Sequence, residues 1–394
     1  MRMLLRLVLA LCLAAWWSGA ARALDVRAAV LRVDYPTVLP IARSDVRPED
    51  LGFAGAALGD EDNQTTGSFL GITFATSNVT ATPETMMEAL DTILSEGIRL
   101  IVVMARAPDL LAIADKAGPD VLILNAEARD TSLRDDQCRA NVLHISPSQN
   151  MMADAVIQFA MWKKWSRLFL IEGSNPADTA LADAYRKAAT KFGAKIVETR
   201  VYEDTGGSRR TDTGHVLVQR QIPVFTQGAK EHDVVIAADA SDVFGLYLPF
   251  NTWEPRPVMG SGGLRPVTFH PDHEAWGATQ FQRRFEELTG RLIHEEDYDV
   301  WLAIRVIGEA AIRTGAAEVP TLRDYMLSDA FELAAFKGRP VNFRSWNGQL
   351  RQPVILTDSK LTISVSPQDG YLHQRNTLDT LGLDQPESAC EAFQ

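Results

Sequence analysis

The clearest hydrophobic pattern of the chain lies between Leu100 and Arg129. Two continuous apolar runs, Leu100–Met104 and Val121–Leu124, each end in a turn that carries one arginine, and a helix predicted over Asp109–Ala117 separates them. Continuous apolar runs bounded by turn residues are typical of parallel strands that are buried on both faces. Because ligands of open parallel sheets bind beyond the carboxyl ends of the strands, this stretch predicts half of a ligand cleft. The two arginines indicate an anionic ligand.

The residues around this stretch alternate between predicted strands and predicted helices. Thr82, Pro83 and Glu84 form a strong helix start, with a capping threonine, a proline in the first turn and an acidic residue after it. Such alternation is the pattern of an α/β sheet with right-handed crossovers. The predicted strands of this part are Val26–Val33, Ser68–Ala75 and Asn141–Ile145, and its other predicted helices are Pro48–Thr66 and Thr82–Glu96.

The same alternation restarts after a helix predicted over Ser148–Lys164, whose apolar positions recur with the spacing of one buried face. Once an export signal is removed, roughly 370 residues remain, which exceeds one comfortable hydrophobic core. We therefore predict two doubly wound α/β domains. The second unit has predicted strands at Arg167–Ile171, Lys195–Val201, His232–Ala237 and Pro257–Gly260, and predicted helices at Pro176–Phe192 and Ser241–Leu248.

Helices dominate the next part of the chain, before a hairpin signal. Gly290 and Gly315 follow two of these helices as stop signals. Asn347-Gly348 between two short apolar runs is a strong hairpin signal. The predicted helices are Glu274–Leu288, Asp297–Arg313 and Thr321–Leu333, the predicted hairpin strands are Val341–Phe343 and Gln352–Leu356, and Leu361–Val365 is strand-like.

Residues 1–23 have the composition of a secretion signal. Arg2 and Arg6 give a positive start, Leu7–Ala15 is a short apolar core, and Ala21-Arg22-Ala23 is a small-x-small cleavage site. The apolar core is too short for a membrane span, so we predict export to the periplasm with cleavage after Ala23; an uncleaved anchor is the alternative. Cleavage removes three arginines and takes the formal charge from −12 to −15. So acidic a protein repels nucleic acid, although a local arginine cluster can still bind a small anion.

Two cysteines, Cys138 and Cys390, remain after this cleavage. In an oxidising compartment a lone pair is most simply one disulfide, which would tie the far C-terminus to the loop behind the cleft stretch. Two free thiols are the alternative. Two distant cysteines without a companion cluster do not make a metal site.

Familiar catalytic and metal-binding motifs have no support in the sequence. It contains no glycine-rich nucleotide-binding fingerprint, no phosphate-binding P-loop and no G-x-S-x-G nucleophile elbow. His270-x-x-His273-Glu274 resembles a metal cluster superficially, but Pro271 interrupts it, and we interpret it as a turn before a helix. We therefore predict that the protein is not an enzyme and holds no metal or cofactor. An exported enzyme is the alternative from another class.

Arginines at the ends of predicted strands carry the chemical signal. Arg106 and Arg129 follow the two strands of the cleft stretch, and Arg265 follows a strand of the second unit. A guanidinium group at such a turn can bind a carboxylate with two parallel hydrogen bonds. The alternative for each arginine is a solvated side chain or a pair with a neighbouring aspartate, Asp109 or Asp130. The three arginines taken together favour the cleft.

Trp253 is a candidate for stacking on a flat ligand, because it lies in a loop between a predicted helix and a strand. Trp301 has helical spacing to apolar neighbours, and we predict it in the core. The candidate ligand-binding residues are therefore Arg106, Glu127, Ala128, Arg129, Ser174, Asp239, Trp253 and Arg265.

Several segments, taken in order, resemble a known family. They are similar to the type I periplasmic solute-binding proteins of ABC uptake systems, in the group of branched-chain amino acid receptors. The segments that carry the resemblance are Gly52-Phe53 to Gly71, Asp233–Asp239, Phe281-x-x-Arg284-Phe285, Tyr298–Gly315, and Val341-x-Phe343 to Val354.

The resemblance implies two α/β domains that are joined by several crossings and close on a ligand like a hinge. It implies a small-molecule ligand and an ABC permease of the inner membrane as partners, no nucleic acid, and a monomer. The implied segments are a signal peptide at 1–23, domain 1 at 24–147 and 270–317, domain 2 at 148–269 and 341–357, and a C-terminal extension at 358–394.

The chain departs from amino-acid receptors where these bind their ligand. Those receptors present small and hydroxyl residues after the third strand and a Gly-Ala-Thr-like turn after the fourth, where this chain has Ala105–Pro108 and Glu127–Arg129. Their second domain offers tyrosines and an acidic residue to the ammonium group, and the matching positions here are Ala177, Ala240-Ser241 and Gly262. The resemblance therefore implies a ligand other than an α-amino acid.

A subgroup of this family is associated with alcohol oxidation that depends on pyrroloquinoline quinone (PQQ). The chain resembles this subgroup in its shortened first loop and in Asn376–Asp384, which leads to Cys390. PQQ is flat, aromatic and carries three carboxylates, which suits arginines and an aromatic ring. The resemblance implies PQQ as the bound ligand. The alternatives are a receptor for an amino acid or another small metabolite, and a protein that hands its ligand to a periplasmic sensor or dehydrogenase.

Overall fold

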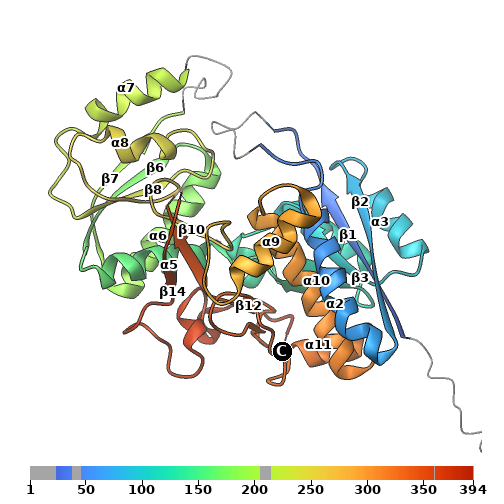
Figure 1. Cartoon of the computed structure of the whole chain (residues 1–394). Coiled ribbons are helices and arrows are strands. Elements are labelled where there is room, and N and C mark those ends of the chain that lie inside the picture. The colour runs from blue at the N-terminus through green and yellow to red at the C-terminus, as the bar shows by residue number, and fades with distance from the viewer. Residues whose placement is uncertain (1–23, 38–45, 205–213, 359, 394) are drawn as a thin grey trace, which may run out of the picture.

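Two parallel β-sheets form the framework of the chain in a computed structural model, which describes residues 24–37, 46–204, 214–358 and 360–393 (Figure 1). The predicted secretion signal lies outside these described residues. The first sheet has the strand order β2-β1-β3-β4-β5, and all its neighbouring strands are parallel. Its strands are β1 (Leu24–Val33), β2 (Ile72–Ala81), β3 (Leu100–Met104), β4 (Leu122–Asn125) and β5 (Val142–His144).

Helices cover both faces of the first sheet, because its central strands are apolar on both sides. Ile101 and Val103 of β3 share one hydrophobic core with α3 and α4. Leu100 and Val102 point to the opposite face and share a second core with α2, α9 and α10. The bounds of these helices are Phe53–Leu70 (α2), Met86–Ser95 (α3), Ala107–Ala117 (α4), Ala278–Thr289 (α9) and Glu295–Thr314 (α10).

The second sheet has the order β7-β6-β8-β9 and is also parallel. The helices α5 and α6 share the core on one of its faces, and α7 and α8 cover the other. Figure 1 shows the two sheets with their helices as two lobes, so the predicted α/β fold with two units is confirmed. The bounds are β6 (Arg167–Gly173), β7 (Lys195–Tyr202), β8 (Val234–Ala238), β9 (Val258–Gly260), α5 (Gln149–Trp162), α6 (Pro176–Phe192), α7 (Gly214–Thr226) and α8 (Leu248–Asn251).

The chain returns to the first unit after the second sheet. The helices α9, α10 and α11 (Val319–Met326) pack into the core of the first sheet. The helices α2 and α10 approach each other closely at Gly55, where a Cβ atom would lie 1.9 Å from the carbonyl oxygen of Asp297. The carboxylate of Asp297 accepts a hydrogen bond of 2.8 Å from the backbone N–H of Gly52 at the start of α2. The domain limits drawn from the sequence stay predictions.

We expect the substitution Gly55→Ala to destabilise the protein by about 2 kcal/mol. The added methyl group overlaps the main chain of α10, and this overlap outweighs the gain of about 1 kcal/mol in helix propensity. The midpoint of equilibrium urea unfolding measures the loss. Ala57→Ser, at an exposed position of the same helix, is the matched control. If Gly55→Ala unfolds at the wild-type midpoint, the two helices have more room than their backbones indicate.

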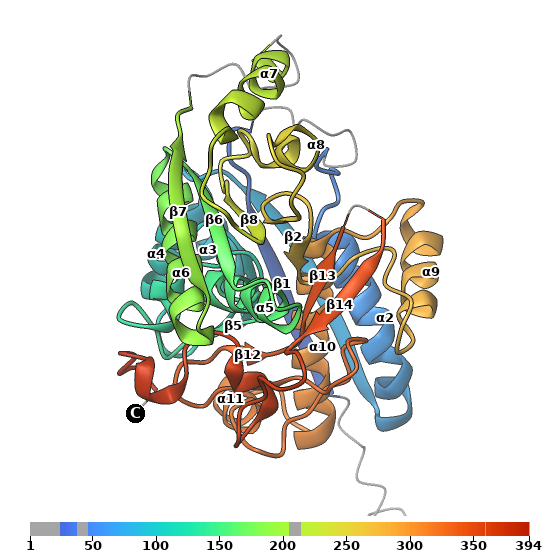
Figure 2. The ribbon, with the colours of Figure 1, turned by 90° about the vertical axis from the view of Figure 1, so that its left-hand side faces the viewer.

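A small antiparallel sheet joins the two units. It has the order β10-β13-β14, with bounds Arg265–Val267, Val354–Thr357 and Thr362–Ser366. Successive side chains of a strand point to opposite faces. Val354 and Leu356 accordingly enter the core of the second sheet, whereas Ile355 enters the core of the first. Figure 2 shows β13 and β14 beside α5.

The predicted hairpin around Asn347-Gly348 has a different second strand. β11 (Asn342–Phe343) pairs with β12 (Leu350–Arg351), not with the predicted Gln352–Leu356. Pro353 lacks the N–H that a continuing ladder needs, so β13 begins after it as part of the joining sheet. The helix predicted over Thr321–Leu333 is also too long, because α11 ends at Met326 and Leu333, beyond its end, forms a bridge with Val341.

Other predicted bounds are wrong where a tertiary contact decides. β2 begins at Ile72, not at Ser68, because α2 continues until the left-handed Gly71. The helix predicted over Ser241–Leu248 is largely a loop with a short 3-10 turn and one turn of α8. The helix α7 was not predicted, since it contains Pro223 and proline is normally excluded from the interior of a helix.

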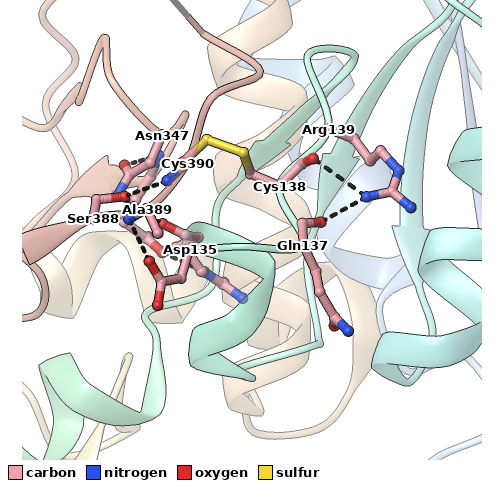
Figure 3. The surroundings of a disulfide bond; sticks show 10 residues. Asp135, Gln137, Cys138, Arg139, Asn347, Ser388, Ala389 and Cys390 are labelled. Atoms are coloured by element: carbon pink, nitrogen blue, oxygen red, sulfur yellow. Dashed lines mark hydrogen bonds between the residues drawn. A yellow bond between two sulfur atoms is a disulfide. The ribbon is translucent and has the colours of Figure 1, made fainter.

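The C-terminal extension is held by the predicted disulfide. Cys138 and Cys390 are bonded, with their Cα atoms 5.6 Å apart (Figure 3). Beside this bond, the backbone N–H of Ala389 donates to the Asp135 carboxylate at 2.5 Å. The hydroxyl of Ser388 donates to a backbone carbonyl of the same loop at 3.0 Å. The alternative of two free thiols is therefore wrong.

Candidate functional site

The turns that follow β1 and β3 bring Tyr35 and Arg106 together. The guanidinium carbon of Arg106 lies 4.1 Å from the centre of the Tyr35 ring. The backbone N–H of Arg106 donates to the Tyr35 hydroxyl at 2.9 Å, and that hydroxyl donates to Asp109 at 2.6 Å. Asp109 is thus occupied by Tyr35, and the exposed Arg106 pairs with no carboxylate of the described residues. Its guanidinium group can receive an anion from solution.

The turn after β4 is fixed by Asn125, which holds Glu127 and Ala128 in place. The Asn125 side-chain oxygen accepts from the backbone N–H of Glu127 at 3.2 Å and of Ala128 at 2.9 Å. Its amide nitrogen donates to the Ala128 carbonyl at 2.7 Å. Short polar side chains that bond their own backbone in this way stabilise tight turns. Ala128 is buried, so its side chain anchors the turn in the protein interior.

The carboxyl group of Glu127 is mostly buried and has an unusual electrostatic environment. Its Oε2 atom is buried without a hydrogen-bond partner among the described residues. Burial raises the pKa of Glu127 to about 7, and the charge of Glu296 acts in the same direction. Arg47, Arg106 and Arg129 act in the opposite direction. The charges of three guanidinium groups therefore act on one carboxyl group at the strand ends of the first sheet.

Arg129 is tied to the start of α10 rather than to Asp130. Its guanidinium group forms an ion pair of 2.9 Å with Glu295 and a hydrogen bond of 3.2 Å with the Thr268 hydroxyl. Burial opposes its charge, but Glu295 and Asp299 outweigh burial and raise the pKa of Arg129 above its ordinary value. Arg129 therefore keeps its positive charge, while Glu295 and Thr268 already bind part of its guanidinium group.

Buried charged groups continue from Arg129 to the segments that join the two units. The Lys337 ammonium group donates to the Thr268 carbonyl at 3.2 Å, and the Ser146 hydroxyl donates to Asp299 at 2.7 Å. Burial lowers the pKa of Lys337 and raises that of Asp299. The turn that carries Glu127 is thus linked through polar contacts to the chain segments near the joining sheet.

Arg47 is a site residue that the sequence reasoning missed. It precedes α2, and its guanidinium group lies 3.8 Å from Asp34. Its Nε atom is buried without a hydrogen-bond partner among the described residues. The available signal was its place in the loop after the first predicted strand, where Arg47 and Pro48 precede a helix. Tyr35, which lies in the same loop after the first predicted strand, was missed as well.

The predicted residues of the second unit have different surroundings. Asp239 follows β8, and its carboxylate accepts the backbone N–H groups of Val243, Phe244 and Gly245 at 2.9, 2.7 and 2.6 Å. These bonds hold the loop that replaces the predicted helix. Asp239 is therefore engaged by its own loop rather than facing a ligand as a free carboxylate.

Ser174, Trp253 and Arg265 are also separate from the arginine cluster. The Ser174 hydroxyl accepts the backbone N–H of Asp204 at 2.9 Å. Trp253 is 55% exposed, so its ring is accessible, whereas Trp301 is in the core as predicted. Arg265 begins β10 and is half-buried. Within the part of the chain that the structure describes, no hydrogen bond or ion pair joins these residues to Arg106, Glu127 or Arg129.

The described residues show neither a metal-binding cluster nor a membrane-spanning helix. Among the described residues, no group of three or more histidine, cysteine, aspartate or glutamate side chains could hold a metal ion. The Nε2 atom of His273 lies 3.1 Å from the Phe336 carbonyl, which agrees with a structural turn there. None of the helices in the described ranges combines the length and the apolar composition that crossing a bilayer requires.

Comparison with known proteins places the fold. Residues 61–223 match the family described as periplasmic binding protein. No curated protein sequence matches the chain. The chain is similar to the leucine-, isoleucine-, valine-, threonine- and alanine-binding protein of Brucella ovis in its closed conformation. The identity is 14%, the TM-score is 0.69, and the match covers 93% of this chain and 98% of the other.

Two further solved structures show the same likeness. One is a periplasmic ligand-binding protein of a branched-chain amino acid ABC transporter from Burkholderia xenovorans. It has 14% identity and a TM-score of 0.70, with 94% of this chain and 100% of that chain covered. The other is a solute-binding protein of an ABC transporter from R. palustris in complex with benzoate. It has 13% identity and a TM-score of 0.63, with 93% and 99% coverage.

Proposed function

We propose, from its periplasmic binding protein type I fold, that this chain is the solute-binding receptor of an ABC uptake system in the periplasm. The fold match spans nearly the whole chain, and the matched family and structures are binding proteins. The predicted export signal and disulfide suit the periplasm. In this role the protein binds a small solute and delivers it to a permease of the inner membrane, and it does not transform the solute.

The ligand that we propose is a small anionic aromatic carboxylate. The observation that carries this proposal is the cluster of Arg47, Arg106 and Arg129 around Glu127, with the Tyr35 ring against Arg106. Guanidinium groups bind carboxylates in a planar, bidentate manner, and an aromatic ring offers a stacking surface. Similar solved structures hold benzoate and 4-hydroxybenzoate, which belong to this chemical class.

PQQ is the specific ligand within this class that we propose. Its support is the sequence resemblance together with the match between its three carboxylates and the arginine cluster. A receptor for an amino acid is the second candidate, which the likeness to a leucine-, isoleucine-, valine-, threonine- and alanine-binding protein favours. The charge of Arg106 opposes it, because an ammonium group beside an arginine that pairs with no carboxylate of the described residues is repelled.

Titration of the purified protein with PQQ, benzoate and leucine, followed by tryptophan fluorescence, separates these candidates. We expect a saturable change with PQQ at micromolar concentration. A saturable response to leucine alone would support the amino-acid receptor instead. If benzoate saturates and PQQ does not, the ligand class stands and the specific ligand is wrong. Conversion of any of these compounds would overturn the receptor role.

The substitution Arg106→Ala is expected to weaken binding of the anionic ligand roughly ten- to a hundredfold. A charge-assisted hydrogen bond to a carboxylate contributes about 1.5–3 kcal/mol when it is desolvated on binding. Isothermal titration calorimetry measures the change. Arg283→Ala, at an exposed position on α9, is the matched control and should bind as the wild type does. Wild-type affinity in both Arg106→Ala and Arg129→Ala would mean that these arginines do not bind the ligand.

A further inference from the structure

Glu127 has a carboxyl group that pairs with none of the described residues, although the charges of Arg47, Arg106 and Arg129 act on it. The Asn125 side chain fixes the backbone of the turn from which the Glu127 side chain extends. No hydrogen bond or ion pair of the described residues reaches this carboxyl group, and Oε2 is buried. A buried polar atom without a partner is costly, and proteins normally avoid it unless the group has a role.

Charged groups from several segments act on Glu127. Arg47 stands before α2, Arg106 before α4, and Arg129 is two residues further in the same turn. Glu296 faces it from the first turn of α10. Arg129 is already paired with Glu295 at 2.9 Å.

The guanidinium groups of this cluster are therefore not equally available. Arg47 has an aspartate at 3.8 Å, and the guanidinium group of Arg106 contacts only the Tyr35 ring among the residues that the structure describes. These two remain for an incoming anion. Such an anion would lie next to the Glu127 carboxyl group, which the same arginines surround.

Two carboxylates that share one site do not both stay ionised. A ligand carboxylate beside Arg47 and Arg106 would therefore raise the pKa of Glu127 above the value of about 7 to which burial has already brought it. Near neutral pH the side chain would then take up a proton when the ligand binds. A protonated carboxyl group has an O–H that can donate a hydrogen bond to a ligand oxygen.

The geometry points to Glu127 as the residue that sets ligand specificity. Its carboxyl group takes up a proton, and the resulting O–H donates a hydrogen bond to the bound anion. This inference rests on the proposed receptor function. It assigns to the site a ligand with a carboxylate at the arginines and an acceptor oxygen within reach of Glu127. An ammonium group at the same place would instead require Glu127 to be ionised.

The sign of the pH dependence follows from this linkage. The pKa of Glu127 is higher in the complex than in the free protein, so the extra affinity is fully present below the free value of about 7. This extra affinity is lost as the pH rises from the pKa of Glu127 in the free protein to its pKa in the complex, by up to about tenfold per pH unit. A ligand whose ammonium group contacts Glu127 would show the opposite trend.

Isothermal titration calorimetry with PQQ and benzoate, in two buffers of different ionisation heat, tests the inference between about pH 6 and about pH 8. The wild type should take up at most about half a proton at pH 7 and more as the pH rises above the free value of about 7, while its affinity falls. Glu127→Gln keeps a donor but cannot titrate, so it should bind both anions without proton uptake and with a flat pH profile. Glu88→Gln, an exposed residue of α3, is the matched control and should keep the wild-type profile.

The possible results distinguish this inference from the proposed ligand. If benzoate binds with proton uptake and PQQ does not bind, the role of Glu127 stands and PQQ is the wrong ligand. If PQQ binds with the same affinity at every pH in both wild type and Glu127→Gln, the ligand stands and the role of Glu127 is overturned. Leucine binding that tightens with rising pH would also overturn it, because Glu127 would then pair with an ammonium group. Failure of all three compounds to bind would overturn both.

Discussion

Replacement of Asp379 by alanine is expected to lower the free energy of unfolding by about 3–5 kcal/mol. The Asp379 carboxylate accepts hydrogen bonds from the Nε atoms of Arg344, at 2.9 Å, and Arg351, at 2.7 Å. The Arg344 and Asp379 side chains are only 1% and 5% exposed. Without the aspartate, two arginines of the β11–β12 hairpin would remain charged and largely buried without a counterion, which is the costly case for a buried ion pair.

The midpoint of guanidinium chloride unfolding measures this loss. Asp369→Ala, an exposed aspartate of the same extension, is the control and should change the midpoint little. A double variant, Arg344→Met with Asp379→Leu, should recover part of the stability, because it removes the fully buried charge with its partner. Equal midpoints for Asp379→Ala and Asp369→Ala would show that water reaches the hairpin arginines.

Removal of the disulfide in a Cys138→Ser, Cys390→Ser variant is expected to cost about 2–5 kcal/mol. The two cysteines are separated by 252 positions in the sequence, so the bond closes a long loop that contains the whole second unit. A long loop loses much conformational entropy in the unfolded state when it is closed, and this loss stabilises the folded state. Thermal unfolding and unfolding in denaturant both measure the effect.

A reducing agent supplies the internal control for the disulfide. It should lower the unfolding midpoint of the wild type to that of the double variant and leave the variant itself unchanged. If the wild type is equally stable before and after complete reduction, the contacts of Ser388 and Ala389 with the loop at 134–135 hold the extension without the covalent bond.

The extension matters for the proposed receptor because it contacts both units within a few residues. Asp379 binds the hairpin that packs on the first core, and Leu381 enters the core of the second sheet. The backbone of Gly382 donates to Asp154 of α5 at 2.7 Å and accepts from Lys191 of α6 at 2.8 Å. The segment from Asp379 to Gly382 therefore joins the two units through a short stretch of chain, since each residue spans at most about 3.6 Å.

Most of the sheet framework could be predicted from sequence because it depends on local patterns. β3 was predicted with its observed bounds, and α6 was predicted from Pro176 to Phe192 as observed. Continuous apolar runs and clear helix-stop glycines are signals within a few residues of the chain. Where a bound depends on packing, as at Ser68 and Leu333, the local signal was insufficient.

The candidate site was predictable only in part. The sequence correctly indicated that Arg106 and Arg129 follow neighbouring parallel strands, and the sheet order brings their turns together. It could not show that Arg129 pairs with Glu295, because the two residues are 166 positions apart. It also could not show that Asp239 is occupied by its own loop, which depends on the backbone of residues 243–245.

The sequence by itself determined the α/β class, the two units, the strand-end arginines and the cysteine pair, because hydrophobic period, turn residues and composition are properties of the linear chain. Only the tertiary structure decided which charges face one another. Folding places Glu127 among Arg47, Arg106 and Arg129 and removes it from water, and both effects depend on distance and burial. The stretch from Leu100 to Arg129 thus supplies the strand ends, and segments from elsewhere in the chain determine their electrostatic environment.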